Sequence, residues 1–174
     1  MTAAVTPIHD AKAPWLASYP AGAPSELDLS TIGTLADRIR KSCSDNAAKD
    51  AYESFGKNLS YSELWRQATA FAAYLQSQGF KKGDRVALMM PNVMAYPIAL
   101  FGTLLAGCVV VNVNPLYTPR ELIHQLRDSG ARMIVVLENF AHVVEEALSE
   151  VKLDKVTIAS AGDALGFKGT IINL

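Results

Sequence analysis

The sequence predicts an α/β fold, with a mostly parallel sheet that carries helices on both of its faces. Short apolar runs suited to buried strands alternate along the chain with longer segments in which apolar residues recur at helical spacing. Proline, glycine and asparagine residues separate these segments. Strands that alternate with helices in this way imply βαβ crossovers, which are right-handed and build parallel sheets.

Composition narrows the class of protein. The chain has 174 residues, of which 50% are hydrophobic and 19% charged, so one domain can bury a core without disulfides or metals. A net charge of −1 offers no basic surface to nucleic acid, so no nucleic-acid partner is expected. Cys43 and Cys108 lack CxxC spacing, and the N-terminal residues lack the apolar core of a secretory signal. We therefore expect a cytoplasmic protein with reduced thiols.

Residues 1–29 are predicted to form an extended arm, because the prolines in this stretch disfavour helices and strands. The stretch from Trp15 to Pro20 is too apolar for a solvated tail, so we expect it to pack on the domain or on another chain. Residues 30–174 are predicted to form the α/β domain, which begins with a helix from Ile32 to Ser42. The last residues, Thr170 to Leu174, resemble the start of a further element, so we expect the natural protein to continue.

A hairpin comes next, with predicted strands Ala51 to Phe55 and Asn58 to Tyr61. Ser60 and Glu63 then have the Ser-x-x-Glu spacing of a capping box, which predicts a helix that continues to Gly79. One face of this helix is apolar and contains Leu64, Trp65, Ala68, Phe71, Ala72 and Leu75.

The middle of the domain is predicted as a strand from Arg85 to Met90, a helix from Met94 to Ala106 and a strand from Cys108 to Val111. Both strands are continuous apolar runs, as expected of strands buried on both faces. The helix is apolar on all sides instead of along one stripe, so it needs burial all round. We therefore expect another domain or subunit to cover it.

The next helix has the clearest start in the sequence. Thr118 occupies the cap, Pro119 the first helical position and Glu121 the third, which together predict a capping box. Gly130 is predicted to end this helix.

The remaining elements are a strand from Met133 to Leu137, a helix whose apolar face runs from Phe140 to Val151, and a strand from Val156 to Ala159. In sheets of this class, ligands bind beyond the carboxyl ends of the strands. Geometry alone therefore directs attention to residues that follow two of the strands, namely Pro91, Asn92, Asn112 and Asn114.

No charged side chain lies between Arg85 and Arg120, a length that would pass a simple test for a membrane span. Prolines, asparagines and a glycine divide this stretch into strand, helix and strand, each too short to cross a bilayer. We therefore expect no transmembrane segment here.

Motifs that carry chemistry are absent from the sequence. There is no G-x-G-x-x-G, Walker loop, G-x-S-x-G elbow or H-E-x-x-H motif. His9, His124 and His142 stand alone, and the last two fall on the polar sides of helices. Asp84 and Arg85 are expected to form a surface ion pair or a loop cap. A solvated helix face explains the carboxylates Glu145, Glu146 and Glu150. No residue is therefore assigned a catalytic, cofactor-binding or metal-binding role.

Several strings in the chain carry a family resemblance. They are LSYSEL (Leu59 to Leu64), GFKKGDRVALMMPN (Gly79 to Asn92) and AGCVVVNVNPLYTPREL (Ala106 to Leu122), with Trp15 to Pro20 and Gln125 to Ala131 in support. Through them essentially the whole chain resembles the adenylate-forming (AMP-binding) superfamily, and most closely its bacterial long-chain fatty-acid CoA ligases.

The resemblance implies a function that composition and spacing do not. Such enzymes use ATP and Mg²⁺ to convert a fatty acid to acyl-AMP, and then transfer the acyl group to CoA. The family's phosphate-binding loop, ribose-binding Asp and C-terminal catalytic Lys would all lie beyond Leu174. The chain is therefore expected to be a truncated N-terminal subdomain, a scaffold that is inactive alone.

The resemblance also implies partners. The remainder of the polypeptide would pack on the apolar helix from Met94 to Ala106, and a long-chain fatty acid would be the substrate. A homodimer formed through Trp15 to Pro20 and peripheral attachment at the inner membrane surface are expected on the same basis.

Two alternatives from other functional classes stay open at this point. A self-contained flavodoxin-like binding domain would have a phosphate-binding turn or an acidic cluster after an early strand, where this chain has Pro91 and Asn92. A non-enzymatic interaction module would use the apolar helix as its docking surface. Other acyl or aryl CoA ligases share the same strings more loosely.

Overall fold

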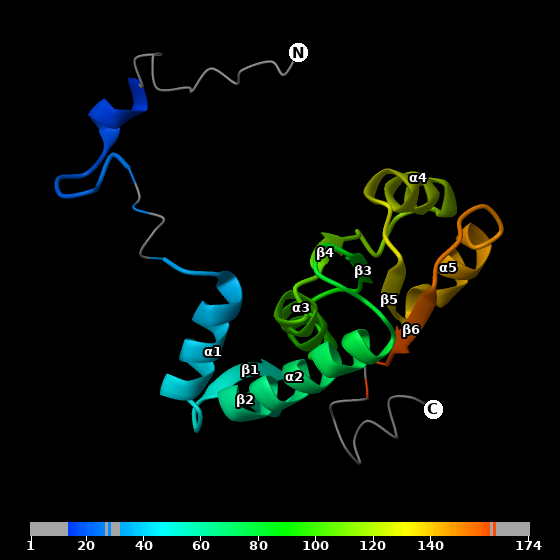
Figure 1. The fold of residues 1–174 in the computed structure, drawn as a ribbon, viewed down its shortest axis with the longest axis horizontal. Coiled ribbons are helices and arrows are strands. Elements are labelled where there is room, and N and C mark those ends of the chain that lie inside the picture. The colour runs from blue at the N-terminus through cyan, green and yellow to red at the C-terminus, as the bar shows by residue number, and fades with distance from the viewer. Residues whose placement is uncertain (1–13, 27, 29–31, 161, 163–174) are drawn as a thin grey trace. The chain divides into compact units, whose positions relative to one another are not determined.

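The computed structural model describes residues 14–26, 28, 32–160 and 162, and the chain divides into two units, Met1–Gly33 and Thr34–Leu174 (Figure 1). In the first unit a short 3₁₀ helix, η2 (Pro14–Ser18), occupies a stretch where prolines were expected to prevent regular structure. Proline is tolerated there because the first turn of a helix needs no N–H donor from it. Trp15 is 54% exposed in this unit.

A four-stranded parallel sheet forms the centre of the second unit, in the order β4-β3-β5-β6. Its strands are β3 (Arg85–Met89), β4 (Val109–Asn112), β5 (Met133–Leu137) and β6 (Lys155–Ala159). Val86 of β3 lies in register with Val110 of β4 and Met133 of β5. The predicted parallel sheet is confirmed.

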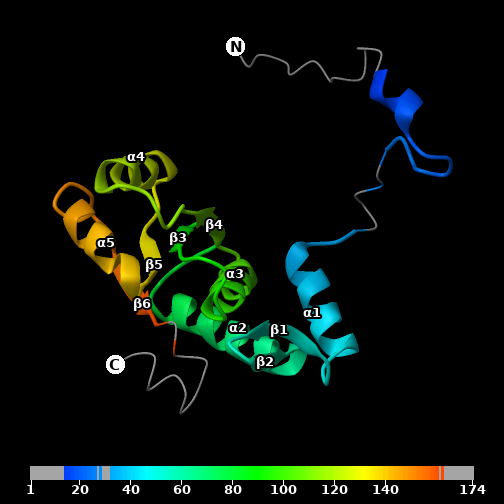
Figure 2. The ribbon, with the colours of Figure 1, turned by 180° about the vertical axis from the view of Figure 1, so that it is seen from behind.

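Helices cover both faces of the sheet, as the sequence predicts (Figure 2). One face is covered by α2 (Tyr61–Ser77) and α3 (Ala95–Leu105). The other face is covered by α4 (Pro119–Ser129) and α5 (Ala141–Ala147). A single turn, η4 (Glu138–Phe140), precedes α5.

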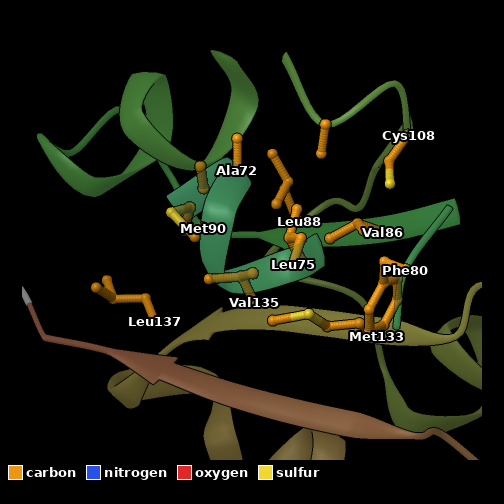
Figure 3. Close-up of a cluster of buried hydrophobic side chains, with 12 residues drawn as sticks. Ala72, Leu75, Phe80, Val86, Leu88, Met90, Cys108, Met133, Val135 and Leu137 are labelled. Carbon is orange, nitrogen blue, oxygen red and sulfur yellow. The ribbon is translucent and has the colours of Figure 1, made fainter. Parts of the chain in front are cut away.

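Side chains of the two central strands alternate between two cores, because successive residues of a strand point to opposite faces. Val86 and Leu88 enter the core beneath α2 and α3, whereas Ala87 and Met89 enter the core beneath α4 and α5. Figure 3 shows the first core, which includes Ala72, Leu75, Phe80, Met90, Cys108, Met133, Val135 and Leu137. This double burial explains why β3 and β5 are continuous apolar runs.

Strand β4 corrects the prediction of a second fully buried strand. Its residues are exposed or half-buried, with Val109 46% exposed. The physical reason is position, because β3 is its one pairing partner among the described strands. The apolar run from Cys108 to Val111 located the strand correctly but did not reveal that it lies at a side of the sheet.

Helix α1 (Leu35–Asp45) begins later than the predicted start at Ile32. Thr34 and Asp37 form a capping box that was not predicted. Thr34 Oγ1 accepts a hydrogen bond from the Asp37 N–H, and the Asp37 carboxylate accepts one from the Thr34 N–H, both at 3.2 Å. A β-region cap of this kind fixes where the first helical turn starts.

The predicted hairpin is confirmed as the antiparallel pair β1 (Asp50–Ser54) and β2 (Lys57–Ser60). Its turn holds Phe55 and Gly56 at φ values of 51° and 69°. Glycine adopts this left-handed region freely, whereas phenylalanine rarely does. The turn was therefore located by Gly56, but the conformation of Phe55 was not foreseen.

The capping box predicted at the start of α2 is only half formed. Ser60 Oγ accepts a hydrogen bond from the Glu63 N–H at 3.2 Å. The Glu63 carboxylate turns away from the cap and accepts hydrogen bonds from Arg66 Nε at 2.8 Å and Gln67 Nε2 at 2.6 Å. These two donors, Arg66 first, lower the pKa of Glu63 to about 2.

The box at the start of α4 is complete, as predicted. The Thr118 N–H donates to the Glu121 carboxylate at 2.8 Å, and the Glu121 N–H donates to Thr118 Oγ1 at 3.4 Å. Gly130 ends this helix in the left-handed region, at φ 60°.

Helix α5 is shorter than its predicted apolar face, and Leu148 just beyond it is 42% exposed.

The all-apolar helix α3 has no exposed residue. Helix α2 approaches it so closely that a Cβ atom on Gly102 would lie 2.7 Å from the carbonyl oxygen of Ala68. Ile39 and Cys43 of α1 join a further core cluster with Met94, which caps α3. Much of the burial that the sequence assigned to another domain or subunit therefore comes from this chain.

The uncharged stretch folds as β3, α3 and β4, as predicted. Within the described part of the chain, no helix combines the length and the hydropathy that a membrane span requires.

Candidate functional site

Polar residues lie at the carboxyl end of the sheet, the end where parallel α/β sheets bind ligands. Asn92 follows β3, Asn112 ends β4, Glu138 follows β5 and Ser160 follows β6. Ser160 Oγ donates a hydrogen bond to Glu138 Oε1 at 2.6 Å. Apart from Glu138, these groups are neutral.

Asn112 joins three elements at this end. Its Oδ1 accepts a hydrogen bond from the hydroxyl of Tyr96, in the first turn of α3, at 3.0 Å. Its backbone oxygen accepts one from Nε2 of Gln125, in α4, at 2.9 Å. The sequence pointed to Asn112 but not to Tyr96 or Gln125, because both contacts connect residues that are distant along the chain.

The other residues singled out at this end shape loops. Asn114 Oδ1 accepts a hydrogen bond from the Leu116 N–H at 3.0 Å, which closes a local turn after β4. The carbonyl oxygen of Pro91 accepts one from the Val93 N–H at 2.8 Å, just before α3. Both residues therefore act as the loop formers that the sequence indicated.

A cavity of about 260 Å³ lies between the β1–β2 hairpin and the start of α3. Asn92 and the carboxylate-bearing Glu53 line it together with mostly apolar or aromatic residues, namely Tyr52, Ser54, Val93, Met94, Tyr96, Pro97 and Leu100. Burial is the main cause that raises the pKa of Tyr52. This lining suits an apolar group better than a phosphate.

A second cavity, of about 340 Å³, lies where α2, the start of α3 and the carboxyl ends of β5 and β6 converge. Its polar groups come from Gln67, Thr157 and Ser160. The rest of its lining is apolar: Phe71, Val93, Met94, Ala95, Ile98, Ala99, Val135, Ile158 and Ala159. Neither cavity contains the basic side chains that would neutralise a nucleotide's phosphates.

The described residues do not fit a magnesium site of their own. Magnesium is usually bound through carboxylates and phosphate oxygens. Across the described ranges, no three His, Cys, Asp or Glu side chains gather where they could hold a metal ion. Glu138 is the one carboxylate among the four polar residues that end the strands, and it already accepts a hydrogen bond from Ser160.

Other titratable side chains show no catalytic arrangement. His124 and His142 are exposed on α4 and α5, as predicted, and His9 lies outside the described residues. Cys43 and Cys108 are buried as free thiols, and burial raises the pKa of both. A raised pKa opposes the thiolate form that a nucleophile needs.

Charged side chains gather instead at the opposite, amino end of the sheet. Arg132, just before β5, donates to Oδ2 of Asp84 at 2.6 Å and to Oδ2 of Asp154 at 2.7 Å. Its guanidinium carbon lies 4.8 Å from the centroid of the Phe80 ring, a cation–π distance. Asp84 also accepts a hydrogen bond from the Lys81 N–H at 2.8 Å, and this donor is the main cause that lowers the pKa of Asp84.

Asp84 therefore makes both the loop cap and the ion pair that the sequence suggested, but its cation is Arg132 instead of the adjacent Arg85. Arg85 closes the end of α4 by donating to the carbonyl oxygens of Ser129 at 2.9 Å and Gly130 at 2.7 Å. No local pattern could have identified these partners, because each contact spans more than forty residues.

Comparison with known proteins identifies the family to which this sequence is similar. A family model described as "AMP-binding enzyme" matches residues 39–171. A long-chain-fatty-acid–CoA ligase of Escherichia coli O6:H1 is 48% identical over 161 residues, which are 91% of this chain and 29% of that protein. A ligase of the same name from Bacillus subtilis is 38% identical over 91% of this chain and 28% of its own length.

Solved structures agree with these sequence matches. A benzoate CoA ligase from Burkholderia xenovorans superposes with a TM-score of 0.68 and 29% identity, over 71% of this chain and 25% of that one. A fatty acyl CoA synthetase from Mycobacterium tuberculosis gives a TM-score of 0.66 and 25% identity, over 78% of this chain and 28% of that one. The chain thus spans less than a third of the length of each of these four proteins.

Proposed function

Since this chain belongs to the AMP-binding enzyme family, we propose that it forms the first α/β part of a long-chain fatty-acid CoA ligase. The observation that carries the proposal is its 48% identity, over 91% of its length, to a relative of that name. The relative is far longer, so the activity is proposed for a whole protein and not for these 174 residues alone.

The proposed reaction has two steps. A fatty-acid carboxylate attacks the α-phosphate of ATP, with Mg²⁺ as counter-ion, and pyrophosphate leaves as acyl-AMP forms. The thiol of CoA then attacks the acyl carbon, and AMP leaves. We assign none of the described residues to either step. Neither of the two cavities described above has a basic side chain in its lining, and no three potential metal ligands gather within the described ranges.

The role proposed for this part of the enzyme is that of a scaffold. Its carboxyl end is held in place by the hydrogen bonds that Asn112 accepts from Tyr96 and Gln125. A rigid sheet end of this kind gives loops from elsewhere in the polypeptide a fixed platform. The isolated chain is therefore proposed to be inactive.

The two alternative functions have less support. A flavodoxin-like binding domain or an interaction module would not account for identity to CoA ligases along 91% of the chain.

We further propose that the remaining polypeptide packs on the start of α3, within the span from Met94 to Ala106. The apolar cavity bordered by Ala95, Ile98 and Ile158 supports this placement. A homodimer formed through the arm is supported by the exposure of Trp15 and Tyr19, at 54% and 45%.

The location we propose is the cytoplasm, with peripheral attachment at the inner membrane surface. The free thiols of Cys43 and Cys108 support a reducing compartment. Membrane attachment rests on resemblance, and flotation of a longer polypeptide with anionic vesicles tests it.

Calorimetric titration tests the main proposal. This chain, and the same protein extended toward the length of its relatives, are each titrated with ATP-Mg²⁺ in the presence of a long-chain fatty acid. We expect binding and acyl-AMP formation only with the extended protein. Nucleotide binding to the 174-residue chain, or an extended protein that activates no fatty acid, would contradict the proposal.

A further inference from the structure

The turn of the β1–β2 hairpin holds an aromatic residue in a conformation that aromatic residues rarely adopt. Ser54 pairs with Lys57, so Phe55 and Gly56 form a two-residue loop in which both φ values are positive, 51° and 69°. Loops of this kind favour Asn-Gly, because asparagine and glycine tolerate the left-handed region. Phenylalanine tolerates it poorly, so Phe55 makes the turn less stable than an asparagine would.

Phe55 gains little burial within this chain to offset that strain. It is 67% exposed, the largest value among the aromatic residues that the structure describes. Strained backbone conformations persist where something else in the protein maintains them, and they are common at functional contacts. A strained residue that is exposed here therefore points to a contact made outside the described residues.

An apolar surface continues from this turn toward the start of α3. Tyr52 of β1 is 41% exposed and borders the cavity between the hairpin and α3, which Pro97 and Leu100 line from the other side. Val93 and Met94 line both this cavity and the larger one beside β5 and β6. The two cavities thus connect the hairpin with the surface that we assign to the remaining polypeptide.

We propose that the remaining polypeptide extends over the β1–β2 hairpin and binds the ring of Phe55 in an apolar pocket. This inference rests on the proposed function, in which these residues belong to a longer ligase. The matched relative supplies the scale, since this chain covers 29% of its length. Burial of an aromatic ring contributes more to stability than the left-handed conformation costs, which accounts for a phenylalanine at this position.

Two other partners fit the hairpin less well. A segment of the same polypeptide meets the turn at a higher effective concentration than a separate second copy does. Glu53 and Lys57 flank Phe55 with opposite charges, so the turn offers no excess of basic groups to an anionic membrane.

Differential scanning calorimetry of Phe55→Asn in two proteins tests the proposal. In the 174-residue chain, asparagine relieves the strain and loses little burial, so Tm should rise by roughly 2–4 °C. In the protein extended toward the length of its relatives, the same change removes a buried ring, so Tm should fall. Opposite signs are the result expected of a residue that is exposed in one protein and buried in the other.

Two further variants serve as controls. Leu116→Asn changes a 78% exposed leucine that is not among the described residues with positive φ, so it should leave the Tm of the 174-residue chain unchanged. Phe55→Leu keeps both the strain and an apolar side chain. It should scarcely change the Tm of the 174-residue chain, and it should lower the Tm of the extended protein less than Phe55→Asn does.

Three results would overturn the proposal. A lower Tm for Phe55→Asn in the 174-residue chain would mean that the ring is used within this chain. An equal rise of Tm in the extended protein would mean that no polypeptide covers Phe55 there. The same rise together with a loss of flotation on anionic vesicles would assign Phe55 to a membrane instead. Fatty-acid activation by the extended protein is measured separately, so each of these results leaves the proposed function standing.

Discussion

At the amino end of the sheet, charged side chains bridge the strands, whereas the carboxyl end carries amides, hydroxyls, the single carboxylate of Glu138 and cavities. Arg132 connects Asp84 with Asp154 through contacts of 2.6 and 2.7 Å. At the other end, Tyr96 and Asn112 are joined by one neutral hydrogen bond of 3.0 Å. The ion pairs of Arg132 therefore lie at the end of the sheet that they stabilise, and not at the end where ligands are expected.

The largest effect is expected from Arg132→Leu. Without the guanidinium, the carboxylates of Asp84 and Asp154 face each other with no cation between them, and the contact with Phe80 is lost. We expect Tm to fall by several degrees in differential scanning calorimetry.

Arg127→Leu is the control for this change, because Arg127 forms one ion pair, with Glu150, in which both side chains are 57% exposed. Exposed pairs of that kind contribute little to stability, so Tm should scarcely move. An equal fall in Tm for Arg132→Leu and Arg127→Leu would show that the ion pairs of Arg132 stabilise the fold no more than one exposed pair does.

The next effect is expected from Gly130→Ala. Gly130 has φ 60°, and an added Cβ atom would lie 2.5 Å from Nη2 of Arg85. The left-handed conformation costs a residue with a Cβ roughly 1–2 kcal/mol, and displacement of Arg85 adds to that cost.

Gly79→Ala separates the two contributions. Gly79 has φ 79°, but a Cβ atom added there would meet nothing within 4 Å. Urea unfolding should therefore show a smaller loss for Gly79→Ala than for Gly130→Ala. Identical losses would mean that the contact with Arg85 is unimportant.

At the carboxyl end, Tyr96→Phe should have a moderate effect. The change removes the hydroxyl that donates to Asn112 Oδ1 and keeps the ring. A neutral hydrogen bond contributes about 1 kcal/mol, so the free energy of unfolding should fall by about that amount. Tyr74→Phe, at a 39% exposed tyrosine of α2, is the control and should have no comparable effect in the same urea titration.

The smallest effect on stability is expected from Glu63→Gln. Glu63 lies at neither end of the sheet, so this change measures how much an exposed charge on a helix contributes. Its pKa in the folded chain is about 2, below its ordinary value of 4.5, so its stabilising effect is present above pH 4.5 and is lost as the pH falls toward 2. The side chain is partly solvated, so the effect amounts to a few tenths of a kcal/mol. Glu63→Gln should remove this part of the pH dependence of the free energy of unfolding, measured by urea titration at several pH values. A loss of stability larger than a few tenths of a kcal/mol would contradict the expectation that this pair with Arg66 behaves as an ordinary exposed helix pair.

Local patterns were sufficient for the elements whose partners are close in sequence. Thr118 and Glu121 form the capping box that their spacing indicates, and β5 has the bounds of its apolar run from Met133 to Leu137. Local patterns were misleading where a stronger partner competed. Glu63 binds Arg66 and Gln67 instead of completing its box, because the guanidinium offers a charge-assisted bond.

The candidate site was predictable only in part. Asn92 and Asn112 were expected at the carboxyl end because they follow apolar strands, and they lie there. The residues that hold that end, Tyr96 and Gln125, come from two helices on opposite faces of the sheet. Their contacts depend on how those helices pack, which no spacing along the chain encodes.

Sequence alone determined the alternation of strands and helices, the parallel sheet and the family, because each depends on local periodicity or on strings of residues. The order of the strands in the sheet depends on the tertiary structure, and this order leaves β4 half-exposed. The burial of α3 against α1 and α2 depends on it as well. The ion pair between Arg132 and Asp84 likewise forms only in the folded chain. The physical reason is that side-chain packing and ion pairing depend on distances in space, and chain folding sets those distances between residues that are far apart in sequence.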